Sequence, residues 1–193
     1  MEKIGPRSYG RSVLRGYVAE MRRAGLYDQV RARASAELAT CMEDPRGVPA
    51  WLGPATLDEL LAIVGGLRGR DAVGALSYHT MKGGGFKSVL EPIIHLSLSM
   101  LGANPGSLFS RADTMVSVVM RGIELKWTPG GKSSGTMRMR CETPVPELSW
   151  AAWEGVFLWA CELAGTRGAV VAARPAPDGR SCEVEVSWEP RKP

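Results

Sequence analysis

The chain has 193 residues, of which 45% are hydrophobic and 23% are charged, and its formal net charge is +4 with an isoelectric point of about 9.0. This length buries a core without help from disulfides or metals, and the hydrophobic fraction is that of an ordinary globular protein. The mild positive charge gives no strong nucleic-acid signal, because such a partner requires basic residues clustered on one face.

Targeting and membrane-spanning segments are not recognised in the sequence. Residues 1–8 are polar, and no apolar stretch of a signal peptide follows them. The longest apolar run, 92–101, is interrupted by His95 and by two serines, and it is too short to span a bilayer. We therefore expect a cytoplasmic protein, in which the widely spaced cysteines are buried free thiols: Cys41, Cys141, Cys161 and Cys182.

The N-terminal part predicts a polar arm, residues 1–11, followed by a single domain over 12–193 whose first part, 12–112, is mostly helical. Thr56 with Glu59, and Ser88 with Glu91, have the spacing of a capping box at a helix start. Hydrophobic spacing and these start signals predict helices over about 13–24, 26–42, 56–64, 71–82, 88–101 and 105–109.

The last third, residues 113–189, predicts two strands, a helix and two more strands. Apolar and polar residues alternate over 121–127 and 137–142, with a glycine-rich turn between them, and the apolar run 115–120 can extend the first of these strands. Arg138 and Arg140 fall on the outer face of their strand and can pair with Glu183 and Glu185 on another, if these strands are neighbours.

A tryptophan-rich helix joins the two predicted hairpins. It begins after Pro144 and Pro146 and runs to about residue 164, and it is apolar on several sides. The strands that follow cover 169–173 and 182–188. Helices followed by this ββαββ unit predict an α+β fold, with a helical layer packed on a four-stranded antiparallel sheet.

Two stretches resemble phosphate-binding loops but lack required positions. In 81–88, Phe86 stands where a glycine should precede Lys87; in 130–133, Lys126 stands where the upstream glycine should be. Nucleotide hydrolysis is therefore not predicted, although the first stretch could hold an anion at a helix start. The alternative interpretation is that residues 81–88 form a loop between two helices.

The two histidines, His79 and His95, cannot form an ordinary catalytic zinc site by themselves, and no H-E-x-x-H motif occurs. His95 lies between Ile94 and Leu96 on an apolar helix, which favours a buried neutral imidazole with one hydrogen-bond partner. Its alternative role is that of a haem or metal ligand.

Six tryptophans are many for this length, and some of them can line a pocket or an interface. No G-x-S-x-G elbow or other local nucleophile arrangement is present, so we expect no enzyme activity. The candidate ligand-binding residues are His79, Lys82, His95, Arg111, Trp127 and Trp159, with no catalytic or metal-binding residue assigned.

Several fragments carry a family resemblance. Residues 101–111 read Leu-Gly-Ala-Asn-Pro-Gly-Ser-Leu-Phe-Ser-Arg, and the chain closes on an Asp-Gly-Arg-Ser-Cys-x-Val-x-Val-x-Trp strand. With the order of elements over about residues 50 to 189, this resembles uncharacterised myxobacterial proteins related to the four-vinyl-reductase ligand-binding domains. Those proteins are in turn similar to TRAPP vesicle-tethering subunits and to haem-nitric-oxide-binding domains.

The resemblance implies a helical layer on a four-stranded sheet with an apolar pocket between them. Members of the wider group bind small hydrophobic molecules or haem, or act as dimeric interaction modules. In the haem-binding relatives, a histidine on a helix before the sheet binds the iron, in a pocket marked by a Tyr-x-Ser-x-Arg motif. That motif is absent from this chain, and His95 precedes the predicted sheet.

We therefore expect a non-enzymatic module of a bacterial regulatory system that senses a small apolar ligand or docks on a regulatory protein. A homodimer without a cofactor is expected. The first alternative is a haem-based gas or redox sensor that uses His95. The second is a small enzyme of unknown reaction, with a site around His79, Lys82 and Arg111.

Overall fold

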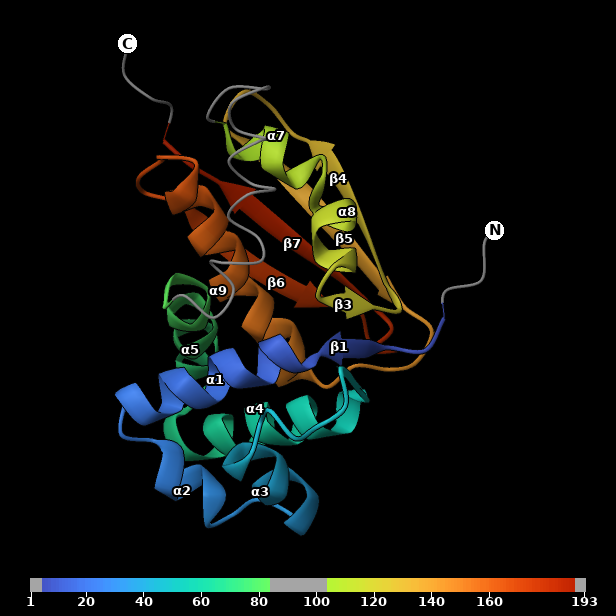
Figure 1. The fold of residues 1–193 in the computed structure, drawn as a ribbon. Helices are drawn as coiled ribbons and strands as arrows, with labels where there is room; N and C mark the ends of the chain where they lie inside the picture. Colours follow the sequence, from blue (N-terminus) through green and yellow to red (C-terminus); the bar gives the residue numbers. More distant parts are fainter. Residues whose placement is uncertain (1–4, 84–103, 190–193) are drawn as a thin grey trace.

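The structure is a computed structural model that describes residues 5–83 and 104–189 (Figure 1). It contains a helical part and a four-stranded antiparallel sheet, which confirms the predicted α+β class. The helices are α1 (Arg11–Arg23), α2 (Tyr27–Arg31), α3 (Ala36–Glu43), α4 (Pro54–Arg68), α5 (Arg70–Lys82), α7 (Pro105–Phe109), α8 (Ala112–Ser117) and α9 (Glu147–Leu163). The strands are β1 (Ser8–Gly10), β2 (Trp51–Leu52), β3 (Met120–Arg121), β4 (Ile123–Pro129), β5 (Ser134–Cys141), β6 (Val170–Pro175) and β7 (Ser181–Ser187).

The larger sheet has the strand order β4-β5-β7-β6, so the two predicted hairpins join through β5 and β7. Arg138 lies opposite Glu183 in this register, and the pair is 2.7 Å apart on the exposed face. Arg140 and Glu185 instead pair with Glu124 and Arg174 on their other neighbouring strands. The charge pattern therefore marks the outer face of the sheet, as predicted.

The inner face of this sheet is covered by α9, which crosses β6 and β7, and by α7 and α8, which lie over β4 and β5 (Figure 1). Met137, Met139 and Val184 point inward and are fully buried. Trp150 of α9 is 1% exposed, and its indole N–H donates to the carbonyl of Gly179 at 3.3 Å. These residues belong to one hydrophobic core, and helices α1 to α5 enclose a second.

The apolar run before β4 is not a strand, contrary to the prediction for 115–120. Residues 112–117 form α8, and only Met120 and Arg121 are extended, as β3. Asp113 in the first turn of α8 accepts a hydrogen bond from the Leu125 amide at 3.2 Å, which ties this helix to β4. Packing over the sheet therefore overrides the strand preference of a short β-branched run.

The prediction of an N-terminal polar arm over 1–11 is wrong for residues 5–11, the part of this range that the structure describes. Residues 8–10 form β1, the central strand of a three-stranded sheet between β2 and β3. Tyr9 is 1% exposed, and burial raises the pKa of its hydroxyl. Backbone pairing with two distant segments holds this polar stretch, and β2 has no strand pattern of its own.

The helix predicted over 26–42 is divided into α2 and α3. Ser35 begins α3 as its N-cap, with its hydroxyl accepting from the Leu38 amide at 3.2 Å. Glu59 accepts from both the amide and the hydroxyl of Ser35, at 2.6 and 2.8 Å. Glu59 is therefore engaged in a tertiary contact, and the predicted capping box with Thr56 does not form.

The limits of α4 also differ from the prediction. It begins at Pro54 after Gly53, which leaves Thr56 buried within the helix, and it continues past Gly65 to Arg68. Gly69, with a φ of 85°, ends it, because that backbone region favours glycine. At α7 the prediction is confirmed: Asn104 accepts from the Gly106 amide at 2.8 Å.

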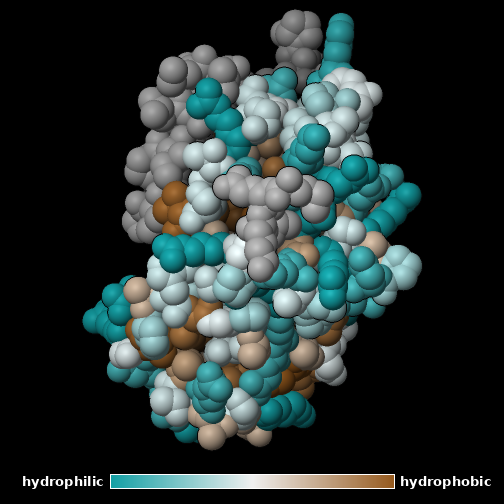
Figure 2. All heavy atoms as spheres, turned by 90° about the vertical axis from the view of Figure 1, so that its right-hand side faces the viewer, coloured by the Kyte–Doolittle hydropathy of each residue, from teal (hydrophilic) through white to brown (hydrophobic). Residues whose placement is uncertain are grey.

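Polar surface dominates the face seen in Figure 2, where hydrophobic atoms are visible only in separate places. Within the described ranges, no helix is long and apolar enough to cross a membrane. All four cysteines are buried free thiols, as predicted, and burial raises the pKa of Cys161 to about 12.

Candidate ligand cavity

A cavity of about 130 Å³ lies where the two hydrophobic cores meet. Its walls come from α1, α4, α5, α7, α8, β3 and α9. No residue of strands β4 to β7 lines it. The expected pocket between helices and sheet is thus shifted to the opposite side of α9, because α7, α8 and α9 fill the space directly above the sheet.

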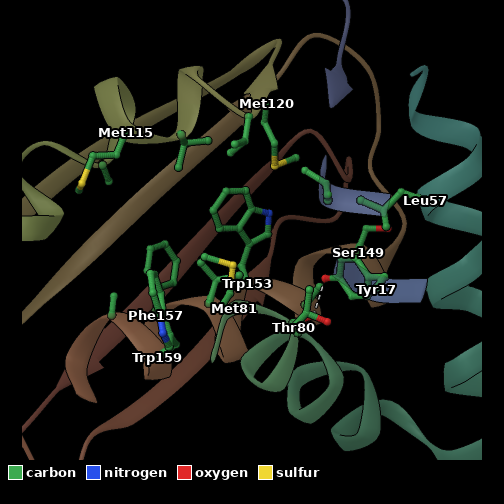
Figure 3. Close-up of a pocket in the computed structure, with 18 of the residues that line it drawn as sticks. Tyr17, Leu57, Thr80, Met81, Met115, Met120, Ser149, Trp153, Phe157 and Trp159 are labelled. Carbon is green, nitrogen blue, oxygen red and sulfur yellow. Dashed lines mark hydrogen bonds between the residues drawn. The ribbon is translucent and has the colours of Figure 1, made fainter. Parts of the chain in front are cut away.

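The cavity walls are almost entirely apolar. Trp153, Phe157 and Met81 project toward this space from α9 and α5, and Met115 and Met120 face them from α8 and β3 (Figure 3). Trp153 is 7% exposed, and its ring lies 5.7 Å from that of Phe157. Such walls favour an apolar ligand, since contact with it removes further apolar surface from water.

A buried ion pair forms the polar end of this cavity. The guanidinium of Arg7 contacts the carboxylate of Asp58, and their side chains are 8% and 17% exposed. The hydroxyl of Ser149 donates to the other oxygen of Asp58 at 2.6 Å. All three residues line the cavity, so its only described charges are one cation and one anion in direct contact.

A second polar group lies on the α5 wall. The hydroxyls of Tyr17 and Ser77 are 2.7 Å apart, and burial raises the pKa of Tyr17 to about 12, so its phenol stays neutral at physiological pH. Thr80, which is 2% exposed, has no hydrogen-bond partner for its hydroxyl among the described residues. These hydroxyls can orient a ligand, but they form no pair of a nucleophile and a base.

Of the two candidate tryptophans, one reaches the cavity. Trp159 of α9 lines it and is half-buried. Trp127 of β4 packs against Phe109 and Trp188, with ring centroids 4.8 and 6.4 Å away, at the end of the sheet. Trp127 therefore belongs to an aromatic cluster of the sheet, and the structure does not place it in the cavity wall.

The three residues of the expected enzyme site are not brought to the cavity. His79 and Lys82 lie on the exposed side of α5, where Lys82 contacts Glu162 at 2.8 Å, and His79 lines a separate, wider groove of about 520 Å³. Arg111 is exposed before α8 and lines neither of these two hollows. The geometry gives no support to a shared site.

His95 lies outside the described residues, as do the helix expected after Ser88 and most of the first phosphate-loop-like stretch. Residues 130–133, the second such stretch, form the turn between β4 and β5. In the described ranges, no group of three or more histidine, cysteine or acidic side chains is arranged to hold a metal ion.

The residues that shape this cavity have no distinctive signal in the sequence. Arg7 lies in the stretch assigned to an arm, and Asp58 and Ser149 occur in helices where a polar residue is ordinary. Trp153 belongs to the predicted tryptophan-rich helix, and its spacing does not distinguish a core side chain from one that borders a cavity. The pairing of β1 with β2 and β3 is what carries Arg7 to this place.

The arrangement described above, an N-terminal group of helices joined through a long helix to a four-stranded antiparallel sheet, is the H-NOX fold. Solved H-NOX structures superpose on nearly the whole chain at very low sequence identity, so the likeness concerns the fold. No protein-family model matches the sequence. No curated protein sequence matches it either.

Among the similar structures is the Fe(II) unliganded H-NOX protein from K. algicida, at 8% identity and a TM-score of 0.69, covering 94% of this chain and 97% of that one. An oxygen-binding H-NOX domain related to soluble guanylate cyclases, solved as its oxygen complex, has 12% identity and a TM-score of 0.60 over 94% and 98%. A structure from work on haem redox potential and porphyrin distortion has 12% identity and a TM-score of 0.61 over 92% and 99%.

These structures bear on the fold named in one branch of the resemblance noted in the sequence. They share the fold of the haem-nitric-oxide-binding branch. They give no support to the four-vinyl-reductase or TRAPP branches. The similar proteins include ones described with haem, iron and oxygen, so the comparisons give no support to the expectation of a chain without a cofactor.

Proposed function

We propose that this chain is a haem-based sensor module, in which the cavity between the two cores holds the haem and His95 binds its iron. The observation that carries the proposal is an apolar cavity with a buried arginine at its end, placed within an H-NOX fold. In this proposal the alternative that uses His95 replaces the cofactor-free module as the leading function.

The lining suits haem in its chemistry. Haem is a flat apolar ring with carboxylates at one edge, and the cavity offers aromatic and methionine walls with Arg7 at one end. None of the described cavity residues is a histidine, the commonest proximal haem ligand, so the proposal assigns this role to His95. Bound haem supplies an iron centre that can take up a diatomic gas.

The space requires the walls to move apart. An engineered cavity of about 150 Å³ holds one benzene molecule, and the cavity here measures about 130 Å³, whereas a porphyrin is several times larger than benzene. Trp153 and Met81 project into this space (Figure 3), so we expect these side chains to change rotamer when haem enters.

The proposal is tested by titrating the purified chain with haem and recording the absorption spectrum. We expect a Soret band that saturates at one haem per chain. The exchange His95→Ala should lower haem affinity by about tenfold or more, or about 1.4 kcal/mol, and shift the band, because the iron loses its protein ligand. Free imidazole should restore the original spectrum in this variant.

The matched control is His79→Ala, because His79 is exposed on α5 and lines the separate groove. This variant should bind haem like the unmodified chain. A chain that gives no Soret band, or that keeps an unchanged band in His95→Ala, overturns the proposal.

The cavity volume favours one second candidate, a sensor of a small apolar molecule without haem. The described space of about 130 Å³ is close to the volume of about 150 Å³ that holds benzene. Perturbation of the Met81, Met115 and Met120 methyl resonances by benzene, in a chain that does not bind haem, would support this function. Unperturbed resonances would exclude it.

Three expectations from the sequence remain predictions and complete the proposed role. The chain catalyses no reaction, it forms a homodimer, and it passes its ligand state to a regulatory protein partner. Light scattering of the haem-loaded chain tests the dimer directly.

A further inference from the structure

Arg7 carries a donor that the described fold leaves without a partner. Its side chain is 8% exposed and lines the cavity, and its Nε–H has no hydrogen-bond acceptor among the described residues. A buried donor without an acceptor is uncommon and costly, so the site calls for an oxygen atom beside Arg7. The described walls beyond Asp58 and Ser149 are mostly apolar, so a molecule bound in the cavity can supply this oxygen.

The present partner of Arg7 explains how such an oxygen can enter. Asp58 contacts only a terminal nitrogen of the guanidinium, and its other oxygen accepts from Ser149. A carboxylate placed side-on would use both Nε and that terminal nitrogen, the two-bond geometry for which a guanidinium is shaped. Asp58 is 17% exposed, against 8% for Arg7, so it can turn toward solvent and yield its position.

We propose that Arg7 is the anchor for a carboxylate of the cavity ligand, and that Asp58 is a built-in competitor that occupies Arg7 until the ligand arrives. This inference rests on the proposed ligand-binding function of the cavity. The competitor makes the cavity selective, because a carboxylate must displace Asp58 from Arg7 to bind. A ligand with an apolar body and no acid group gains nothing from this exchange.

The test compares ligands that differ only in their acid group. Haem and haem dimethyl ester share the ring and the iron, but the ester has no carboxylate. We expect Arg7→Met to lower the affinity for haem by about tenfold and to leave the affinity for the ester unchanged. We expect Asp58→Asn to raise the affinity for haem by about tenfold, because Arg7 is then free of its competitor. The affinity for the ester should again stay unchanged.

Matched controls come from an exposed ion pair of the same kind, Arg31 with Glu43. Arg31→Met and Glu43→Gln remove one partner each and should leave the affinities for haem and for its ester unchanged. If Arg7→Met does not fold, Asp58→Asn still decides the matter, since its expected effect has the opposite sign. The amide oxygen that this exchange introduces can still accept from the hydroxyl of Ser149.

A second pair of probes separates this inference from haem binding. Naphthalene-1-acetate and naphthalene-1-acetamide differ in charge alone and contain no iron. The acetate should bind Asp58→Asn about tenfold more tightly than the unmodified chain, and the amide should bind both alike. A missing Soret band together with this result overturns the haem proposal alone. Equal effects of Asp58→Asn on the two members of each pair overturn the role of Arg7 and Asp58.

Discussion

Gly155→Ala should destabilise the fold by more than about 3 kcal/mol, at the upper end for an overpacked core. A Cβ atom at Gly155 would lie 1.9 Å from the carbonyl oxygen of Gly74 and 2.7 Å from the amide of Tyr78. Both are backbone atoms of α5, so no side chain can move aside, and α5 and α9 must separate. Urea denaturation followed by circular dichroism measures the loss.

Gly74 provides the control on the facing helix. A Cβ there would lie 3.5 Å from the carbonyl oxygen of Ala151, an ordinary contact. Alanine is preferred over glycine in a helix by about 0.8–1.0 kcal/mol. Gly74→Ala should therefore be as stable as the unmodified chain or slightly more so. Similar stability of the two variants would mean that α5 and α9 do not cross at Gly155.

Trp153→Ala should lower the free energy of unfolding by about 3 kcal/mol, the lower end for loss of a buried tryptophan. The indole is 7% exposed and packs on Phe157, but part of it faces the cavity, where it has fewer contacts to lose. The control is Trp159, which is half-buried and also lies in the cavity wall. Its change to alanine should lower the free energy of unfolding by less. Thermal and urea denaturation of both variants measures the difference.

The same variant tests whether the cavity must widen to admit haem. Removing the Trp153 indole enlarges the space in advance, so haem should associate faster with Trp153→Ala than with the unmodified chain. Stopped-flow absorbance in the Soret region gives this rate. An association rate that Trp153→Ala leaves unchanged would show that Trp153 does not obstruct the path of haem.

The sheet could be predicted from the sequence because its information is local. Alternation in β5 and β7 fixes which residues face inward, and the Arg138–Glu183 pair agrees with the register that this alternation requires. The division between α2 and α3 could not be predicted from such a local pattern. It depends on Ser35 meeting Glu59, a contact between residues far apart in the sequence.

The cavity was harder to predict than the fold, because a cavity is defined by side chains that fail to fill a space between elements. Trp159 was a candidate on account of its residue type, and it does line the cavity. Arg7 shows the opposite case: its local sequence is polar and without periodicity, and β1 pairing alone brings it to Asp58. His79 lines the separate groove, whereas Arg111 lines neither that groove nor the cavity, so the structure does not bring them to one site.

The most direct test of the account is to find which methionine side chains lie beside the bound haem. Met81, Met115 and Met120 line the cavity, whereas Met42 is fully buried elsewhere, in the core of the N-terminal helices. In a chain with ¹³C-labelled methionine methyl groups, ferric haem should broaden the three cavity resonances and leave that of Met42 sharp. Sharp resonances from all three cavity methionines in the haem-loaded chain would contradict the account.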